Sequence, residues 1–189
     1  MGHDHTNKLR ASDYTVRPIP YADGAALVAR LHYTGSAGKT ATHCHGMFDA
    51  AGTLVGAALW LPTTPGAART VSDDWRGVLA LFRLVVSPHV PANAASYLIG
   101  RSLRLIKRDK RWHTLLTYAD QRQGHTGSIY RATNWTYLGE TAAQPWWVDG
   151  NGNTVSRKAT RSRSYAEMRD LGYRIAGRSK KHKFVMRLR

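Results

Sequence analysis

The feature that most limits the fold is an alternation of strand and helix signals in the middle of the chain. Residues 78–86, VLALFRLVV, form an almost continuous apolar run with one charge, and residues 115–120, LLTYAD, form a second run. Between them, Asn93 precedes a stretch with apolar residues at helical spacing that extends to about Asp109. Strands that alternate with helices in this way indicate a mixed sheet with helices on its faces.

The flanking segments extend this pattern on both sides. A helix is predicted over 22–33, and a hairpin is predicted from the strands 43–48 and 53–61, joined by a turn at 49–52. The remaining predictions are a loop over 62–70, a helix over 125–135, a second hairpin from 146–148 and 154–156, a short helix over 164–171 and a last strand over 184–188. The expected fold class is therefore α+β, with a central mixed sheet flanked by helices.

Length and composition favour a single domain. A chain of 189 residues of which 42% are hydrophobic is long enough to bury a core and is not typical of a disordered protein. Residues 1–20 are polar and contain two prolines, so we expect a loosely ordered lead-in there and one domain over 21–189. The end of that domain, about 145–189, is a basic region, since residues 151–189 hold 12 Lys or Arg and 2 acidic residues.

The charge balance indicates a polyanionic partner. Lys and Arg number 28 against 12 acidic residues, which gives a formal net charge of +16. This self-repulsion destabilises a compact fold, and duplex DNA is the densest polyanion that offsets it. An anionic membrane surface is the alternative, and it requires a basic amphipathic helix, for which residues 93–109 are a partial candidate. No apolar run approaches the length of a membrane span, so a cytoplasmic protein is expected.

Two positions have side chains or backbone groups suited to anion binding. Arg83 interrupts an apolar strand, where a guanidinium must be paired or face a ligand because burying it alone is costly. An Arg that binds an anionic group bidentately and an Arg that faces solvent fit this position equally well. Asn93 and Ser96 open a helix after a proline-containing loop, where free backbone N–H groups bind phosphate, although a plain N-cap explains the same residues.

Later in the chain, several residues have both a structural and a functional interpretation. Asp120 ends a strand, where ligands of open α/β sheets gather and where turn-forming Asp is also common. Tyr130 lies in the next predicted helix, where core packing with a satisfied hydroxyl is the simpler role. Trp146 and Trp147 precede the basic region, and they either pack in the core or stack on bases that have left the duplex.

The stretch His43-Cys44-His45 has the composition of a metal-binding cluster. On a strand, however, the two histidines point to one face and Cys44 points to the other. Two histidines without a third ligand nearby make a weak site, so the sequence predicts no metal, with His43 and His45 as the alternative. Cys44 is the only cysteine, which excludes an internal disulfide.

Several of these segments together resemble a known family. They are the stretches 81–86 (LFRLVV), 93–97 (NAASY), 118–120 (YAD) and 124–135 (GHTGSIYRATNW). These stretches are similar to the bacteriophage Mom proteins, and the similarity runs from about His32 to Tyr137 and more weakly to residues 181–185. Mom proteins convert adenine in double-stranded DNA to an N6-carbamoylmethyl form, which protects phage DNA from host restriction enzymes.

The resemblance implies a fold similar to the GNAT acyltransferases, in which the strand at 78–86 splays from the strand at 114–120. It also implies a DNA-modifying transferase of the host-cell cytoplasm, with double-stranded DNA and a small-molecule group donor as partners. Acetyl-CoA or another acyl-CoA is one candidate donor, and its pyrophosphate would lie at the helix start near Asn93. GNAT enzymes have a glycine-rich loop there, whereas residues 90–95 of this chain read VPANAA, so the donor stays open.

Functional positions follow from the resemblance and from the charge of the C-terminal region. The catalytic set implied by the family is His32, Arg83, Ser96, Asp120 and Tyr130. The implied cofactor-binding set is Val85, Asn93, Ala94, Ala95 and Ser96. From the basic C-terminal region we expect phosphate contacts with DNA at Arg157, Lys158, Arg161, Arg163, Lys180 and Lys181.

These residues suggest a mechanism in which an adenine leaves the duplex so that its N6 amine can be reached. Asp120 would act as a base or orient the amine, and Tyr130 or Ser96 would donate a hydrogen bond or a proton. Arg83 would hold an anionic or carbonyl group of the donor, and His32 would move a proton or orient the base. Two alternatives stay open: an acetyl-CoA-dependent N-acyltransferase that acts on a protein or small amine, and a non-catalytic DNA-binding protein with a steep salt dependence.

Overall fold

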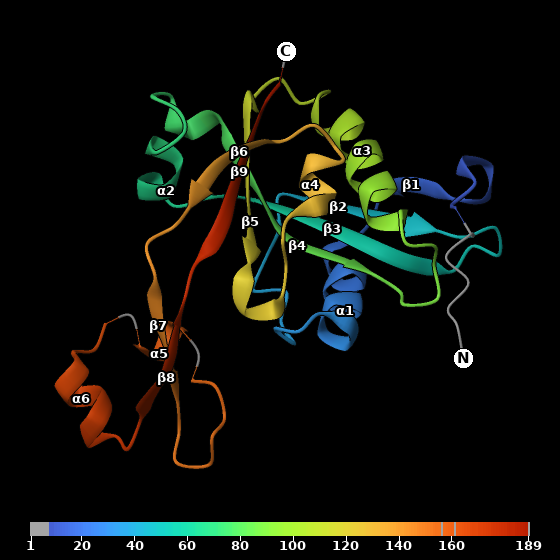
Figure 1. Ribbon diagram of the computed structural model, residues 1–189. Helices are drawn as coiled ribbons and strands as arrows, with labels where there is room; N and C mark the ends of the chain where they lie inside the picture. Colours follow the sequence, from blue (N-terminus) through green and yellow to red (C-terminus); the bar gives the residue numbers. More distant parts are fainter. Residues whose placement is uncertain (1–7, 156, 161, 189) are drawn as a thin grey trace. The chain divides into compact units, whose positions relative to one another are not determined.

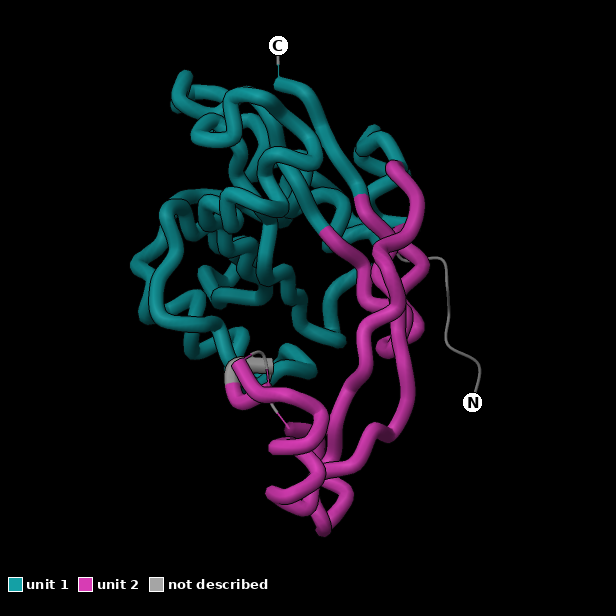
Figure 2. Tube along the Cα trace, turned by 90° about the vertical axis from the view of Figure 1, so that its left-hand side faces the viewer, with its two compact units in different colours: residues 1–117, 128–137, 184–189 teal, residues 118–127, 138–183 magenta. Residues whose placement is uncertain are grey.

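The computed structural model describes residues 8–155, 157–160 and 162–188, and it describes Arg157 and Lys158 by their backbone alone. The chain divides into two compact units (Figure 2). Unit 1 comprises residues 1–117, 128–137 and 184–189, and unit 2 comprises residues 118–127 and 138–183. The predicted division into a lead-in and a single domain stays a prediction.

Among the described residues, seven strands form one mixed sheet in the order β1-β2-β3-β4-β5-β9-β6. Their bounds are Thr15–Pro18 (β1), His43–Phe48 (β2), Leu54–Pro62 (β3), Val78–Val86 (β4), Thr114–Asp120 (β5), Thr136–Glu140 (β6) and Lys181–Arg187 (β9). Strands β1 to β4 pair antiparallel in chain order, and β4 pairs in parallel with β5. The central mixed sheet predicted from the sequence is thus confirmed.

Helices cover both faces of the sheet in unit 1 (Figure 1). Helix α1 (Tyr21–Leu31) packs on the face that carries Leu59, within a core cluster of apolar side chains. Helix α3 (Ala94–Ile106) lies on the opposite face, where a Cβ at Gly56 would come within 3.2 Å of the Leu98 side chain. The absence of a side chain at Gly56 therefore lets α3 lie close to β3. Among the described residues, no helix has the length and apolar character needed to cross a bilayer.

The N-terminal stretch is more regular than its polar composition indicates. Residues 15–18, within the predicted lead-in, form β1 by pairing with β2, from Thr15 opposite Phe48 to Pro18 opposite His45. Backbone hydrogen bonds to an existing strand supply an ordering force that composition does not reveal.

Two other predictions for unit 1 are wrong at the level of secondary structure. The predicted loop over 62–70 contains helix α2 (Pro65–Arg69), which begins because the Thr64 side chain caps it and a proline occupies the first turn. The predicted helix over 125–135 is reduced to α4 (Ser128–Arg131). It ends early because Asn134 adopts a positive φ of 63°, which a helix does not accept.

Unit 2 contains a two-stranded sheet, and its pairing differs from the predicted hairpin. Strand β7 (Gln144–Val148) pairs antiparallel with β8 (Arg174–Ser179). Of the strand predicted over 154–156, Thr154 forms a bridge with Val148, and Ser156 lies outside the described residues. The longer ladder with β8 satisfies more backbone groups, which explains why it forms instead. The helices of unit 2 are α5 (Arg157–Thr160) and α6 (Tyr165–Asp170).

Candidate functional site

The parallel ladder between β4 and β5 stops halfway along β4. Its last pair is Leu81 with Thr117, in agreement with the splayed strands that the resemblance implies. On its other edge, against β3, β4 has a bulge at Phe82. Bulges bend a strand and redirect its side chains, and they are common beside active sites. We call the position after Leu81 and Thr117 the strand fork, and Arg83 lies directly beyond it.

Arg83 is half-buried beside the loop that follows α1. Its Nε donates to the Ser36 carbonyl at 2.8 Å, and its Nη1 donates to the Phe82 carbonyl at 2.7 Å. Burial lowers the pKa of the guanidinium, and the neighbouring phenols of Tyr33 and Tyr21 act in the opposite direction. Among the described residues, no carboxylate forms an ion pair with Arg83. Its charge is therefore available to an anionic ligand.

The loop after α1 brings His32 and Tyr33 to the same region. The His32 Nδ1 shares a 2.9 Å hydrogen bond with the Thr34 hydroxyl, and the His32 ring stacks on Tyr33 with 4.4 Å between centroids. Tyr33 is 50% exposed, and it lies near enough to affect the pKa of both Arg83 and Tyr130. Sequence reasoning missed Tyr33, whose one signal is its place directly after His32.

Tyr130 is buried in α4 and reaches the strand fork. Its ring packs on Trp135 and Phe184, with centroid distances of 5.8 and 5.2 Å. Burial raises the pKa of the phenol, and a side-chain hydrogen bond with Thr117 acts to lower it. The Thr117 hydroxyl donates to the Leu81 carbonyl at 3.0 Å, so Tyr130 is linked to the last pair of the ladder. The phenol stays protonated at neutral pH.

The predicted cofactor-binding residues lie at the end of β4 and the start of α3. Val85 and Ala94 are 6% and 0% exposed, so their side chains belong to the core. Asn93 occupies the N-cap position without capping α3, because its Oδ1 accepts the Leu9 N–H at 2.9 Å. The Ser96 hydroxyl donates to the Asn93 carbonyl at 2.8 Å. Among the described residues, neither Ser96 nor Ala95 forms a hydrogen bond with a residue of the strand fork, so their predicted roles stay predictions.

The turn before α3 differs from a glycine-rich phosphate-binding loop. Ser87 accepts the N–H groups of His89 and Val90, through its hydroxyl and its carbonyl respectively. Pro91 has no N–H, and its carbonyl accepts the N–H of Ala94 at 2.9 Å. The N–H groups of His89, Val90 and Ala94 are thus used within the turn, and side chains stand at 92–95 where a phosphate-binding loop has glycines. These residues do not fit a pyrophosphate of the usual acyl-CoA type, and we derive no chemical step through such a donor.

Asp120 belongs to unit 2, where other groups already engage its carboxylate. It caps the 3-10 turn 121–123 by accepting the Arg122 N–H at 3.1 Å. A second oxygen lies 3.7 Å from the Lys181 Nζ, and the Asp120 side chain is 17% exposed. The structure therefore brings Arg83, Tyr130 and the region of His32 together in unit 1, while Asp120 is described within unit 2. Its catalytic role stays a prediction.

Three of the predicted DNA-contact residues have described side chains, and each of these has a partner within unit 2. The Lys180 Nζ lies 2.8 Å from a Glu140 oxygen, and Lys181 pairs with Asp120. Arg163 donates to the carbonyl of Ala159. Outside the described part of the chain lie Arg161 and the side chains of Arg157 and Lys158. The predicted phosphate contacts of these six residues stay predictions.

The two adjacent tryptophans of β7 have different surroundings. Trp147 is 5% exposed and meets Tyr165 edge-on at 5.4 Å, so it packs in the core of unit 2. Trp146 is partly exposed, and the Arg122 guanidinium lies 3.9 Å from the centre of its ring. The core interpretation is thus confirmed for Trp147, and base stacking stays a prediction for Trp146.

The histidines of β2 lie on one face, as strand alternation predicts. His45 shares a 2.5 Å hydrogen bond with Ser102 of α3, whereas Cys44 joins the core cluster under α1. The His43 Nε2 accepts the Trp112 indole N–H at 3.0 Å. Within residues 8–155, 157–160 and 162–188, no group of three His, Cys, Asp or Glu side chains is placed to hold a metal ion. A metal ion bound by His43 and His45, the alternative left open by the sequence, would therefore have no third protein ligand among the described residues.

Burial of His45 makes the stability of the fold depend on pH. Burial, and to a smaller extent the nearby His43, lowers the pKa of His45 from 6.5 to about 4. Between these values the unfolded chain binds a proton that the folded chain excludes, so stability decreases as the pH falls through this window. We expect a loss of about 2–3 kcal/mol between pH 7 and pH 4.5, measured by urea unfolding.

A variant separates the contribution of His45 from that of other titrating groups. His45→Gln keeps a polar side chain near Ser102 but does not titrate in this range, so its stability should change less with pH than that of the wild type. An equally steep loss in the variant would show that His45 is not the group responsible.

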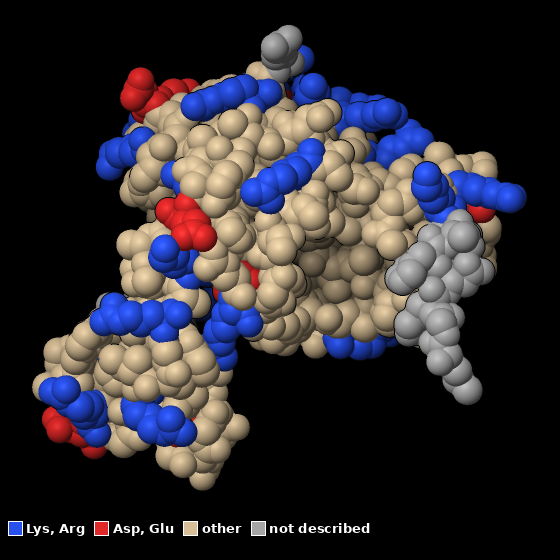
Figure 3. Space-filling view, in the orientation of Figure 1, with Lys and Arg blue, Asp and Glu red and all other residues tan. Residues whose placement is uncertain are grey.

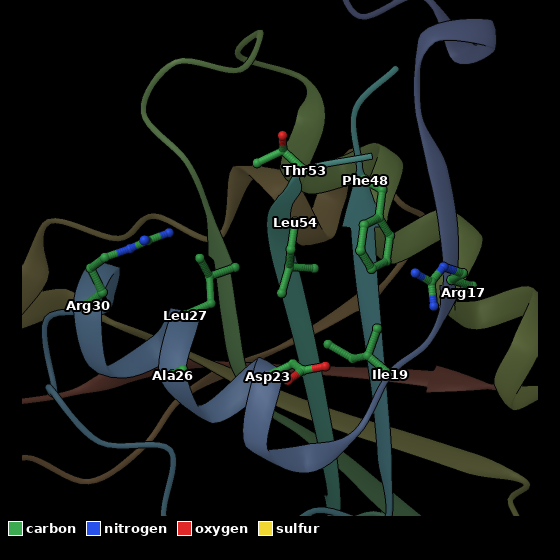
Figure 4. Close-up of a pocket in the computed structure, with 9 residues that line it drawn as sticks. All are labelled: Arg17, Ile19, Asp23, Ala26, Leu27, Arg30, Phe48, Thr53 and Leu54. Carbon is green, nitrogen blue, oxygen red and sulfur yellow. The ribbon is translucent and has the colours of Figure 1, made fainter. Parts of the chain in front are cut away.

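A pocket of about 470 Å³ lies apart from the predicted site residues, between α1, β1 and the β2–β3 turn. Figure 4 shows its lining: Arg17, Ile19, Asp23, Ala26, Leu27, Arg30, Phe48, Thr53 and Leu54. The Arg17 guanidinium lies 4.0 Å from the centre of the Phe48 ring. None of the predicted catalytic, cofactor-binding or DNA-binding residues lines this pocket, so it is not part of the candidate site.

Sequence comparison relates the chain to a phage protein family. The sequence model described as "Mom protein family" matches residues 13–189. Methylcarbamoylase mom of Escherichia phage Mu is 29% identical over 103 residues, which cover 51% of this chain and 42% of that protein. The match thus spans less than half the length of this curated relative.

Structure comparison relates the fold to N-acetyltransferases. A putative phosphinothricin N-acetyltransferase matches with a TM-score of 0.57 and 11% identity, over 93% of this chain and 99% of its own. The spermidine N-acetyltransferase of Vibrio cholerae in complex with CoA and spermine gives 0.56 and 12%, over 94% and 96%. A putative acetyltransferase of Acinetobacter baylyi gives 0.58 and 8%, over 95% of each chain. At these identities the likeness concerns the fold alone, and it confirms the expected GNAT-like architecture.

Proposed function

Since the chain belongs to the Mom protein family, we propose that it is a transferase that modifies adenine in double-stranded DNA. The observation that carries this proposal is the family match, which extends over residues 13–189. The phage Mu relative is named a methylcarbamoylase, and we propose that this chain adds a similar group to the N6 amine of adenine. DNA modified in this way would resist restriction enzymes.

The proposed reaction needs a nucleophilic amine and an electrophilic donor carbon. The N6 lone pair forms the new bond while the donor's leaving group departs with its bonding electrons, and one N6 proton passes to a base. An adenine paired in the duplex does not present N6 for this attack, so the base would have to flip out. Asp120 is the proposed base or amine-orienting group, and releasing its carboxylate from Lys181 would make it available.

Arg83 is the proposed anchor for the donor. Two of its N–H groups are used by the Ser36 and Phe82 carbonyls, which fix the plane of the guanidinium. The remaining donors carry an uncompensated charge, which suits a carboxylate, phosphate or carbonyl oxygen. Such a preorganised cation stabilises negative charge that develops in the transition state.

Tyr130 and Tyr33 are the proposed hydrogen-bond donors beside Arg83. Tyr130 is rigid and protonated, whereas Tyr33 is half-exposed and stacks on His32. The exposed ring of Tyr33 offers a stacking surface for an extruded base. His32 would orient that ring or move a proton, and Ser96 remains a candidate donor at the start of α3.

Restriction digestion tests the proposed function with an internal control. Plasmid DNA recovered from cells that express the chain should resist enzymes whose recognition sequence contains adenine. The same DNA should be cut normally by enzymes whose sites contain only G and C. Resistance should be absent with an Asp120→Asn variant of equal abundance. Normal cutting at every adenine-containing site, with abundant folded protein in cells that supply the donor, would contradict the proposal.

An acyl-CoA-dependent N-acyltransferase is a second candidate that rests on the fold alone, since the turn before α3 does not fit the pyrophosphate of that donor. It predicts saturable binding of acetyl-CoA and transfer of an acetyl group to a small amine without DNA. Calorimetric titration with acetyl-CoA, followed by an acetylation assay on polyamines, separates the two candidates.

A further inference from the structure

The end of α3 and the turn after it carry six basic residues within eleven positions of unit 1. We call them the α3 basic edge: Arg101, Arg104, Lys107, Arg108, Lys110 and Arg111. Arg101 is partly exposed, and the other five are exposed. In the orientation of Figure 1, Lys and Arg side chains occupy the surface above α3 in Figure 3. This surface lies outside the C-terminal region from which we predicted DNA contacts.

The charges of the α3 basic edge are not neutralised within the described part of the chain. None of the six residues forms an ion pair there. The one acidic residue among them, Asp109, accepts the Arg111 N–H at 3.1 Å and lies 3.3 Å from the His43 Nε2. Lys180 and Lys181 of unit 2, by contrast, each pair with a carboxylate. The α3 basic edge is thus a dense group of exposed cations that have no ion-pair partner among the described residues.

The number of cations exceeds what the helix itself requires. One or two basic residues in the last turn stabilise a helix through its dipole, and further ones repel each other. Two of the arginines also lie against aromatic rings, Arg101 over Tyr97 at 5.1 Å and Arg111 over Trp112 at 4.5 Å. Stacking restricts the guanidinium plane and leaves its N–H edge free for oxygen ligands.

The apolar side of α3 argues against a membrane as the partner. Leu98, Ile99 and Ile106 are completely buried, and Leu103 is 8% exposed. A helix that binds a bilayer surface inserts its apolar stripe among the lipids, and here the sheet already covers that stripe. The solvent-exposed side of α3 is positively charged, and such a surface suits a polyanion with regularly spaced phosphates.

We propose that the α3 basic edge binds the phosphate backbone of double-stranded DNA, as a contact surface on unit 1 separate from the basic C-terminal region. This inference rests on the proposed function and names a surface that holds its substrate. From Arg101 to Ile106 the helix rises roughly 7 Å, and the turn after it extends the surface further, while each DNA strand carries a phosphate about every 3.4 Å of axis. The surface therefore spans several phosphates, and it reads no sequence by itself.

Salt-dependent binding measurements test this surface directly. The test variant is Arg104→Gln/Lys107→Gln/Arg108→Gln, and the matched control is Lys8→Gln/Arg10→Gln/Arg30→Gln, which removes the same charge from exposed positions elsewhere in unit 1. Affinity for a labelled 20-base-pair duplex is measured by fluorescence anisotropy over a range of salt concentrations. We expect the test variant to bind at least ~10-fold more weakly at low salt, with a salt slope smaller by about 2–3, because each phosphate contact contributes ~0.9.

The possible outcomes distinguish a failure of this inference from a failure of the proposed function. A test variant that binds duplex DNA no worse than the control variant would overturn the inference and leave the modification activity untouched. Weaker binding of the test variant to phosphatidylserine vesicles, without weaker DNA binding, would overturn it in favour of a membrane. Wild-type protein that binds no duplex DNA would contradict the proposed function itself. Circular dichroism checks that both variants are folded.

Discussion

Replacing Arg83 with alanine should lower the amount of modified adenine by about 100-fold or more while the protein stays folded. The reason is that Arg83 has an uncompensated charge directly beyond the strand fork, next to Tyr33. Removing it leaves the Ser36 carbonyl with the Thr34 hydroxyl as its remaining donor, at 3.0 Å, so the loop keeps one of its two hydrogen bonds. Quantitative mass spectrometry of nucleosides measures the activity, and thermal unfolding measures the fold.

Two matched variants sharpen the Arg83 prediction. Arg83→Lys keeps the charge but loses the planar arrangement of donors, so its activity should fall between those of the wild type and Arg83→Ala. Arg30→Ala removes an exposed arginine of α1, which contacts none of the predicted site residues in the described structure, and should retain full activity. An Arg83→Ala protein that is folded and as active as Arg30→Ala would remove Arg83 from the site.

Replacing Tyr130 separates a chemical role from a packing role. Tyr130→Ala removes a buried ring from contact with Trp135 and Phe184, and it should lower the free energy of unfolding by about 3–5 kcal/mol. Tyr130→Phe keeps the ring and removes the hydroxyl, which should cost about 1 kcal/mol of stability. If the hydroxyl is the donor proposed here, Tyr130→Phe should lower modification by about 100-fold or more, as the loss of a preorganised donor does elsewhere.

A neighbouring tyrosine provides the control. Tyr137 also packs on Phe184, at 5.2 Å, but it is 39% exposed. Tyr137→Phe removes the same hydroxyl group from the same chemical type of residue, and it should leave modification unchanged. Equal activity of Tyr130→Phe and the wild type would assign Tyr130 to packing alone.

The strands of unit 1 could be predicted well because their signals are local. The strand predicted over 78–86 is observed with the same bounds, because Gly77 and Pro88 limit a continuous apolar run. The hairpin of β2 and β3 and the helix before it were predicted within two residues at each end. Periodicity and turn residues report burial and backbone geometry directly, so they suffice for such elements.

Two of the wrong predictions involve strand partners distant in sequence. The residues 146–148 pair with β8, more than twenty positions later, and no local turn signal marks that partner. β1 likewise forms because β2 offers it an edge. The pairing of strands depends on contacts made in the assembled sheet, and local sequence patterns do not encode those contacts.

The candidate site was predicted in part. Arg83 and Tyr130 came from a resemblance to known proteins, and the structure places both beside the strand fork. Tyr33 was missed because its position depends on how the loop after α1 packs against β4. The α3 basic edge was visible as charge in the sequence, whereas the absence of ion-pair partners among the described residues required the structure.

Nucleoside mass spectrometry detects the proposed modification of adenine itself. DNA is recovered from cells that express the wild type, Arg83→Ala or Arg30→Ala at equal abundance, and its deoxynucleosides are compared by tandem fragmentation. We expect a heavier deoxyadenosine with the added mass on the base, present with the wild type and Arg30→Ala and strongly reduced with Arg83→Ala. Unmodified deoxyadenosine with all three proteins, in a host that supplies the donor to a known Mom protein, would contradict the proposed function.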